Sequence, residues 1–201
     1  MALTRTGPIT INPHAVALGL AQIRVGASAT NIANDNGVLA VSDSIGALAN
    51  TSFNGETEFW RLESGFPLLE DLSLPIRERA SLECAFKELS VANLALARGI
   101  DPADIDEYDD EIGLGGLSSP DFIRMEAVYT FPNRESQMVI IFPRANVVSS
   151  MAIELQAEDA AAVPITFEAK RADSGLSTGG DAVWDEKPLG TIVFRTGEPT
   201  S

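Results

Sequence analysis

The stretch LPIRERASLECAFK, residues Leu74–Lys87, decides the fold, because apolar side chains recur in it at every second position. Apart from Glu78, the even positions are apolar: Leu74, Ile76, Ala80, Leu82, Cys84 and Phe86. The odd positions are mostly charged or small and include Arg77, Arg79, Glu83 and Lys87. Successive side chains of a β-strand point to opposite faces. The pattern therefore predicts a long strand with one face in a core and the other in water.

The same reasoning predicts strands elsewhere along the chain. The further segments are 16–25, 57–63, 123–131, 138–142, 151–156, 165–169 and 190–195. Residues 138–142 are apolar on both faces, as is typical of a central strand. In 123–131 the alternation places Arg124 and Glu126 on a wet face, and Val128 is its one exception.

A single helix is predicted between Ser90, which can cap its first turn, and Gly99, which can end it. Many short strands with one helix indicate a mainly β fold, a β-sandwich or barrel with one flanking α-helix. At 201 residues the chain fits one domain, 1–201.

Composition and charge exclude several classes of protein. The chain has 29 acidic and 14 basic residues, a formal net charge of -15, and would be repelled by a nucleic-acid backbone. Its longest bulky apolar run, Met138–Phe142, is far shorter than the ~20 residues that span a bilayer. Cys84 is the only cysteine, which excludes an internal disulfide framework. We therefore expect a soluble protein folded in a reducing cytoplasm, without a signal peptide or membrane anchor.

Four segments do not have the composition of a core. Residues 1–13 are predicted to form an extended N-terminal arm and residues 196–201 a C-terminal tail. Residues 27–55 are rich in Ala, Ser, Asn and Gly and are predicted as a long loop between strands. Such a long loop inside a compact domain is usually functional. Residues 101–120 begin with an acidic run, 101–111.

The sequence predicts no enzyme and no cofactor. Gly175–Gly179 matches the G-x-S-x-G nucleophile pattern, but the only histidine, His14, precedes it and no later base is present. An EF-hand loop starting at Asp104 fails, because its fifth and sixth positions are Tyr108 and Asp109. A looser calcium site in this run stays open, and so does a sugar site beside Trp60. Cys84, on the apolar face of its strand, is predicted to be inert core.

In three blocks, Glu63–Asp101, Val163–Phe194 and Gly19–Asn31, the sequence resembles the tail tube (major tail) proteins of long-tailed bacteriophages. The first, Glu63–Asp101, contains a Gly-Phe-Pro turn, the long strand and the short helix. The second, Val163–Phe194, is similar to the family's C-terminal strand, loop and closing strand. The third, Gly19–Asn31, is similar to its first strand entering a long loop.

The resemblance implies a structural virion protein of the phage tail, assembled in the host cytoplasm. Protomers are expected to close into rings, usually hexamers, with their sheets joined into one barrel around a lumen. Rings are then expected to stack with the help of the terminal arms and the long loop. The expected partners are other copies of the chain, the tape-measure protein and neighbouring tail proteins, with genome DNA passing through without tight binding.

Two sets of residues are predicted to serve this assembly. Inter-ring contacts are expected from residues of the long loop: Ser28, Asn31, Ile32, Asn34, Val38, Leu39, Ile45 and Phe53. The lumen or a subunit interface is expected to include Glu56, Glu58, Arg77, Arg79, Glu83, Lys87, Arg124 and Glu126. Of these, Glu56 and Glu58 are candidates for a negative lumen surface, which would let DNA slide without sticking. Deletion of residues 30–50 is expected to leave a folded monomer that cannot polymerise.

Two alternatives remain open from the sequence. One is another ring-forming component of a phage tail or of a secretion tube. The other is a calcium- or sugar-binding β-sandwich module. Tube length with and without a tape-measure partner would distinguish the first from the tail tube, and calorimetry with Ca²⁺ or glycans would identify the second.

Overall fold

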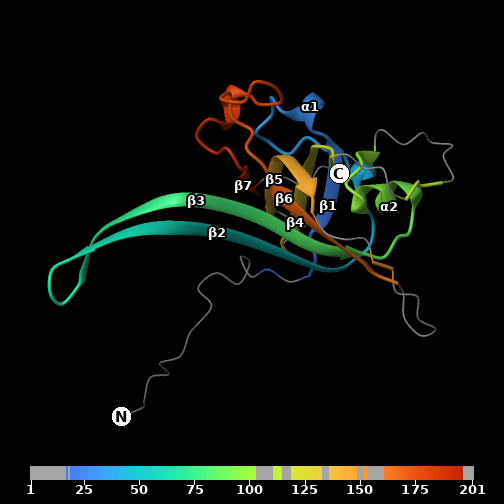
Figure 1. Cartoon of the computed structure of the whole chain (residues 1–201). Helices are drawn as coiled ribbons and strands as arrows, with labels where there is room; N and C mark the ends of the chain where they lie inside the picture. The colour runs from blue at the N-terminus through green and yellow to red at the C-terminus, as the bar shows by residue number, and fades with distance from the viewer. Residues whose placement is uncertain are drawn as a thin grey trace, which may run out of the picture.

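A computed structural model of the chain describes residues 17, 19–102, 111–114, 119–132, 136–148, 152–153 and 161–196. The fold is mainly β, as predicted (Figure 1). In the described residues the strands are β1 Gln22–Ala27, β2 Leu48–Ser64, β3 Leu69–Phe86, β4 Ile123–Thr130, β5 Ser136–Val147, β6 Val163–Ala169 and β7 Thr191–Thr196. The helices are α1 Ser28–Asn31 and α2 Val91–Ala97, with 3-10 turns η2 Val41–Asp43 and η4 Ala182–Trp184.

All seven strands belong to one antiparallel sheet, in which six follow the order β1-β4-β5-β6-β3-β2 and β7 pairs with β5 beside this path. Strand β5 is central to this sheet because it pairs with three other strands. Along one edge it pairs with β4; along the other it pairs with β7 at Ser136–Ile141 and with β6 at Ala145–Val147. Strand β6 then pairs with only the last part of β3, from Ser81 to Phe86.

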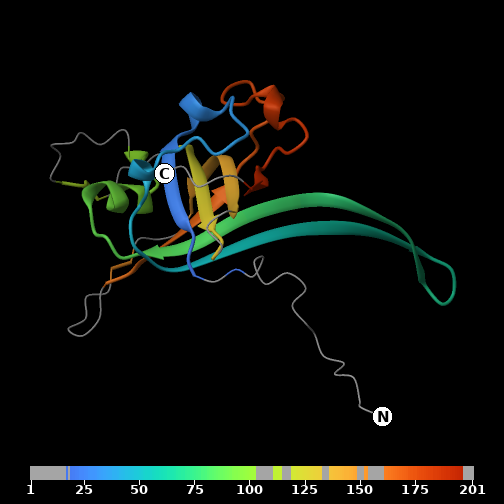
Figure 2. The ribbon, with the colours of Figure 1, turned by 180° about the vertical axis from the view of Figure 1, so that it is seen from behind.

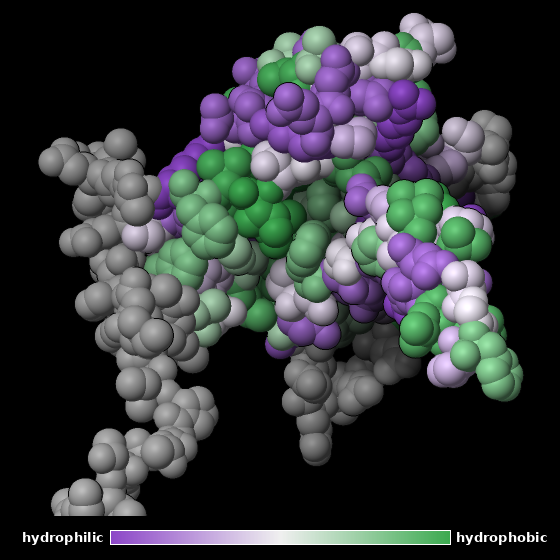
Figure 3. Space-filling model, turned by 90° about the vertical axis from the view of Figure 1, so that its left-hand side faces the viewer, coloured by the Kyte–Doolittle hydropathy of each residue, from purple (hydrophilic) through white to green (hydrophobic). Residues whose placement is uncertain are grey.

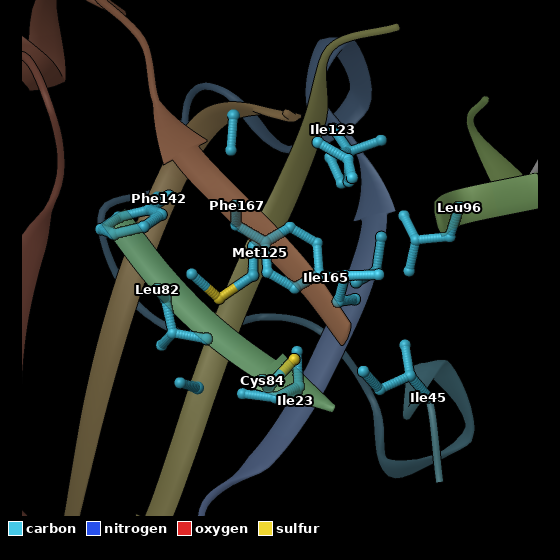
Figure 4. Packing of buried hydrophobic residues seen from close by; sticks show 14 of the residues in the cluster. Ile23, Ile45, Leu82, Cys84, Leu96, Ile123, Met125, Phe142, Ile165 and Phe167 are labelled. Atoms are coloured by element: carbon cyan, nitrogen blue, oxygen red, sulfur yellow. The ribbon is translucent and has the colours of Figure 1, made fainter. Parts of the chain in front are cut away.

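The main core lies inside the sheet, which curls so that its two halves face each other. Figure 4 shows β3 and β6 crossing over β1 and β4, with Leu82, Phe167, Met125 and Ile23 between them. In β4 and in the last part of β3, every second side chain points inward. These inward side chains together fill the core. Leu96 of α2 and Ile45 cover one end of the core (Figure 4).

The predicted helix is confirmed as α2, which flanks the sheet. The Ser90 side chain accepts a hydrogen bond from the backbone N–H of Asn93 at 3.1 Å, and Gly99 follows the last turn with φ of 80°. The Asn93 side chain donates in turn to the carbonyls of Ile45 and Glu88 at 3.0 and 2.9 Å. The helix is thereby joined to the segment leading into β2.

Replacing Ser90 with alanine is expected to lower the free energy of unfolding by about 1 kcal/mol, because the N–H of Asn93 loses its acceptor. Denaturant unfolding of the purified chain measures the change. Ser177→Ala, in an exposed loop, is the control and should change the stability little. Equal effects of the two substitutions would contradict the capping role.

Three predicted segments differ from the structure. Strand β1 begins at Gln22 rather than near Val16, and β2 begins at Leu48 rather than at Thr57. Of the predicted strand 151–156 the structure describes only Ala152 and Ile153, and neither lies in a strand. The predicted arm 1–13, most of the acidic run 101–111 and most of the tail 196–201 lie outside the described residues.

The predicted core face of β3 is correct only for its last part. Leu82, Cys84 and Phe86 are buried, whereas Leu74 and Ile76 are exposed. The reason is the limited length of the neighbouring strand: β6 pairs with β3 no further than Ser81. Beyond that residue β3 has only β2 as a partner.

Candidate assembly surface

Strands β2 and β3 form a hairpin that projects far beyond the rest of the molecule (Figures 1 and 2). The two strands have 17 and 18 residues and are paired from Leu48 with Phe86 to Ser64 with Leu69. Every residue from 52 to 79 is exposed, and we call this segment the hairpin arm. Its strands rise ~3.3 Å per residue, so the arm is roughly 40 Å long.

The hairpin arm carries an unusual amount of exposed apolar surface. Its large exposed apolar side chains are Phe53, Phe59, Trp60, Leu62, Phe66, Leu68, Leu69, Leu72, Leu74 and Ile76. An isolated two-stranded hairpin is marginally stable at best in water. Contiguous apolar patches of this kind mark sites of association. The arm therefore has the composition of a surface that is covered in an assembly.

A β-bulge divides the arm into two parts with different faces. Glu58 pairs with Arg77 and Phe59 pairs with Pro75, so Ile76 is an extra residue on β3. The extra residue changes which side chains of β3 share a face with those of β2. As a result, the face that carries charged pairs near the body carries apolar pairs near the tip.

The charged pairs lie on the body side of the bulge. Glu56 is opposite Arg79 and Glu58 is opposite Arg77, and these four side chains line one shallow hollow. The Arg77–Glu58 ion pair spans 3.4 Å, with the two side chains 59% and 53% exposed, so it adds little stability. With an arginine opposite each glutamate, this patch by itself is neutral rather than negative.

The apolar pairs lie on the tip side of the bulge. On the same face of the ribbon, Trp60 is opposite Leu74 and Leu62 is opposite Leu72. Each of the four side chains remains nearly half exposed despite its partner. Cross-strand contact within the arm thus leaves a continuous apolar surface for another molecule.

The prediction that Arg124 and Glu126 face a lumen or a neighbour is wrong, because both side chains are completely buried in the protomer. The Arg124 Nε atom lies 2.7 Å from Oε1 of Glu126. The other guanidinium nitrogens donate to three backbone carbonyls, those of Asn31, Asn34 and Asn36, at 2.6–2.7 Å. Burial is tolerated because the charges are paired and hydrogen-bonded.

The segment that covers this ion pair is the predicted long loop itself. The carboxylate of Glu126 accepts hydrogen bonds from the backbone N–H groups of Val38 and Leu39, at 3.0 and 3.3 Å. Arg195 donates to the carbonyl of Gly37 at 3.2 Å. The loop is therefore ordered by its own chain, and ordering by another copy is not needed.

Several predicted inter-ring residues are consequently not available for contacts between rings. Ser28, Leu39 and Ile45 are buried, and the Ser28 hydroxyl donates to the carbonyl of Pro143 at 2.8 Å. Asn31 and Ile32 are partly buried and use their backbone carbonyls within the protomer, whereas Asn34, whose carbonyl is used in the same way, keeps an exposed side chain. Val38 remains exposed, and Phe53 lies not in a loop but in β2, at the base of the hairpin arm. The predicted loop 27–55 thus ends before Leu48.

A second, smaller core forms under this loop, on the outer face of the sheet. Trp184 is completely buried with Val128, Val139 and Ile141, and its indole N–H donates to the carbonyl of Ile32 at 2.6 Å. Nearby, Lys187 and Asp35 form an ion pair at 2.8 Å. The hydrogen bond and the charge of Lys187 hold the pKa of Asp35 below its usual value.

The described residues contain no group of three or more His, Cys, Asp and Glu side chains arranged to hold a metal ion. Ser177 of the G-x-S-x-G match is exposed, and His14 lies outside the described residues, as does most of the acidic run. Cys84 is buried, which raises the pKa of its thiol to about 12 and keeps it unreactive. None of the described helices is long and apolar enough to cross a membrane.

Sequence reasoning missed the hairpin arm as a surface, although its signal was present. Strands were predicted on both sides of the turn at Gly65–Pro67, which predicts a hairpin. Apolar residues at Leu68, Leu69 and Leu72 are unusual so close to a turn. Comparison of the chain with protein-family models and with curated proteins gives no match.

Proposed function

We propose that the chain is a structural protein that assembles with copies of itself into rings, and that the rings stack into a tube of the phage-tail kind. The observation that supports this most is the hairpin arm, with its many exposed apolar side chains concentrated on the tip side of the bulge. In a monomer the apolar side chains of the arm stay exposed to water, whereas in an oligomer a neighbouring copy can bury them. The resemblance of Glu63–Asp101, which includes the tip and one strand of the arm, to tail tube proteins points the same way.

In this proposal the polar part of the arm faces the lumen or a neighbouring subunit. Arg77 and Arg79 of the arm are exposed, and so are Glu83 and Lys87, which follow the arm along the chain. Edge strands such as β2 offer unpaired backbone groups, which a neighbouring sheet can satisfy when a barrel closes across subunits. The excess of 29 acidic over 14 basic residues suits a conduit for DNA, because phosphates would not adhere to it. The tape-measure protein and neighbouring tail proteins are the further partners in this proposal.

Electron microscopy of the purified chain tests the proposal directly. We expect rings or tubes to appear above a threshold concentration, and sedimentation velocity to detect the same transition. A chain that stays monomeric at high concentration over a wide range of salt contradicts the proposal. Rings that never stack would instead indicate another ring-forming tail or secretion component.

A further inference from the structure

An apolar hollow lies where the hairpin arm separates from the body of the molecule. Its volume is about 150 Å³, and its walls come from three elements. The lining residues are Phe53 and Ala80 of the hairpin, Ile140 and Phe142 of β5, and Leu189, Gly190, Thr191 and Ile192 at the start of β7. Figure 3 shows apolar surface on the side of the molecule from which the arm projects.

The hollow follows from the sheet topology. Strand β6 pairs with both β3 and β5, but β7, which pairs with β5 further along, has no ladder with β3. The two parts of the sheet therefore diverge beyond Ser81 and leave a wedge between them. The rings of Phe53 and Phe142, with centroids 6.3 Å apart, form one aromatic wall of the wedge.

The tip of the hairpin arm presents an apolar side chain with no contact of its own. Phe66 is fully exposed, and Leu68 and Leu69 beside it are each about two thirds exposed. Gly65 has a φ of 84°, which favours glycine and forms the turn that places Phe66 at the extreme end. Phe66 lies thirteen positions after Phe53, so the tip lies roughly 40 Å along the arm from the hollow of its own chain.

We infer that the hollow receives Phe66 from the hairpin tip of a second copy of this chain, an inference that rests on the proposed self-assembly. Size supports it, because an apolar cavity of ~150 Å³ lined by Leu, Ile and Phe binds benzene, the size of a phenylalanine ring. Chemistry supports it too, since side chains that line the hollow are nearly all apolar.

The contact would join two different surfaces, a tip and a hollow. Such a head-to-tail contact leaves a free hollow on one copy and a free tip on the other, so it propagates into a ring or a filament instead of stopping at a dimer. Burial of a single phenylalanine side chain in a hollow does not offset the translational and rotational entropy that two proteins lose on association. Assembly through this contact should therefore be cooperative, with little dimer present.

Cysteine pairing between two variants tests the contact. Chains carrying Phe66→Cys and chains carrying Ile192→Cys are mixed under mild oxidation, and disulfide-linked dimers are counted on a non-reducing gel. The native Cys84 is buried and does not interfere. The control replaces Ile192→Cys by Val41→Cys, an exposed apolar position outside the hollow. We expect the first mixture to form at least ten times more mixed dimer than the control mixture.

A second variant separates this inference from the proposed function. Phe66→Ser should raise the threshold concentration for assembly at least tenfold, while Val41→Ser should not change it. If the wild-type chain polymerises but Phe66→Ser does so equally well and no selective mixed dimer forms, the tip does not occupy the hollow, although self-assembly stands. If Phe66→Cys chains link only to one another, the contact is tip to tip and the inference is wrong. If the wild-type chain itself never polymerises, both proposals are overturned.

Discussion

Replacing Arg124 with methionine is expected to lower the free energy of unfolding by about 3–5 kcal/mol, the usual cost of removing one partner of a buried ion pair. Methionine keeps the apolar stem of the side chain but removes every donor. The Glu126 carboxylate would then remain buried without that partner, and three carbonyls of residues 31–36 would lose their donor. Denaturant unfolding followed by circular dichroism measures the loss.

Arg77→Met provides a matched control for this substitution. Arg77 also pairs with a glutamate, but both side chains are more than half exposed, so its loss should cost less than about 1 kcal/mol. Hydrogen exchange adds a local measurement, since the N–H groups of Val38 and Leu39 donate to Glu126. A loss of less than about 1 kcal/mol for Arg124→Met would show that the ion pair does not hold the loop on the sheet.

The failure to predict this ion pair has a clear physical reason. Alternation assigns charged residues to water, and this holds for Arg77 and Arg79 but not for Arg124 and Glu126. A charged side chain can be buried when groups from distant parts of the chain form hydrogen bonds or ion pairs with it. The alternation within one strand carries no information about those distant groups. The apolar Val128, on the same face of β4, was the available signal that this face is covered.

The predictable parts of the fold are those in which packing in the core determines the pattern of apolar residues. Leu82, Cys84 and Phe86 alternate because one face of β3 packs across the core toward β1 and β4, so periodicity predicted their burial. Leu74 and Ile76 continue the same pattern, yet they project into solvent. Their exposure depends on where β6 and β7 end, which is a property of distant segments and cannot be seen in the local sequence.

Burial by distant segments also changes the outcome expected for the deletion of residues 30–50. The sequence predicted a folded monomer without its assembly loop. The structure overturns that expectation, because Leu39 and Ile45 are buried and residues 48–50 belong to β2. Such a deletion would remove core residues, so a loss of assembly would only reflect unfolding. Residues 58–77 of the hairpin arm, in contrast, can be removed without touching the core.

Truncation of the hairpin arm is therefore expected to abolish assembly while leaving the body folded. The design replaces residues 58–77 with Asn-Gly, which favours a two-residue turn between the paired residues Thr57 and Glu78. Every removed residue is exposed in the protomer, so the cooperative unfolding transition of the body should be retained. Electron microscopy should find no rings or tubes, even at concentrations at which the full-length chain polymerises completely.

A chain with an unchanged arm length controls for non-specific effects of the truncation. Ser177→Ala, in an exposed loop of the body, keeps the whole arm, and it should still polymerise. A folded truncated chain that forms tubes as readily as the full-length chain would contradict the role of the arm.

Because the truncated chain keeps the hollow but offers no tip, small amounts of it added to the full-length chain should also shorten the tubes. Shortening without co-polymerisation of the truncated chain at tube ends would contradict the head-to-tail contact.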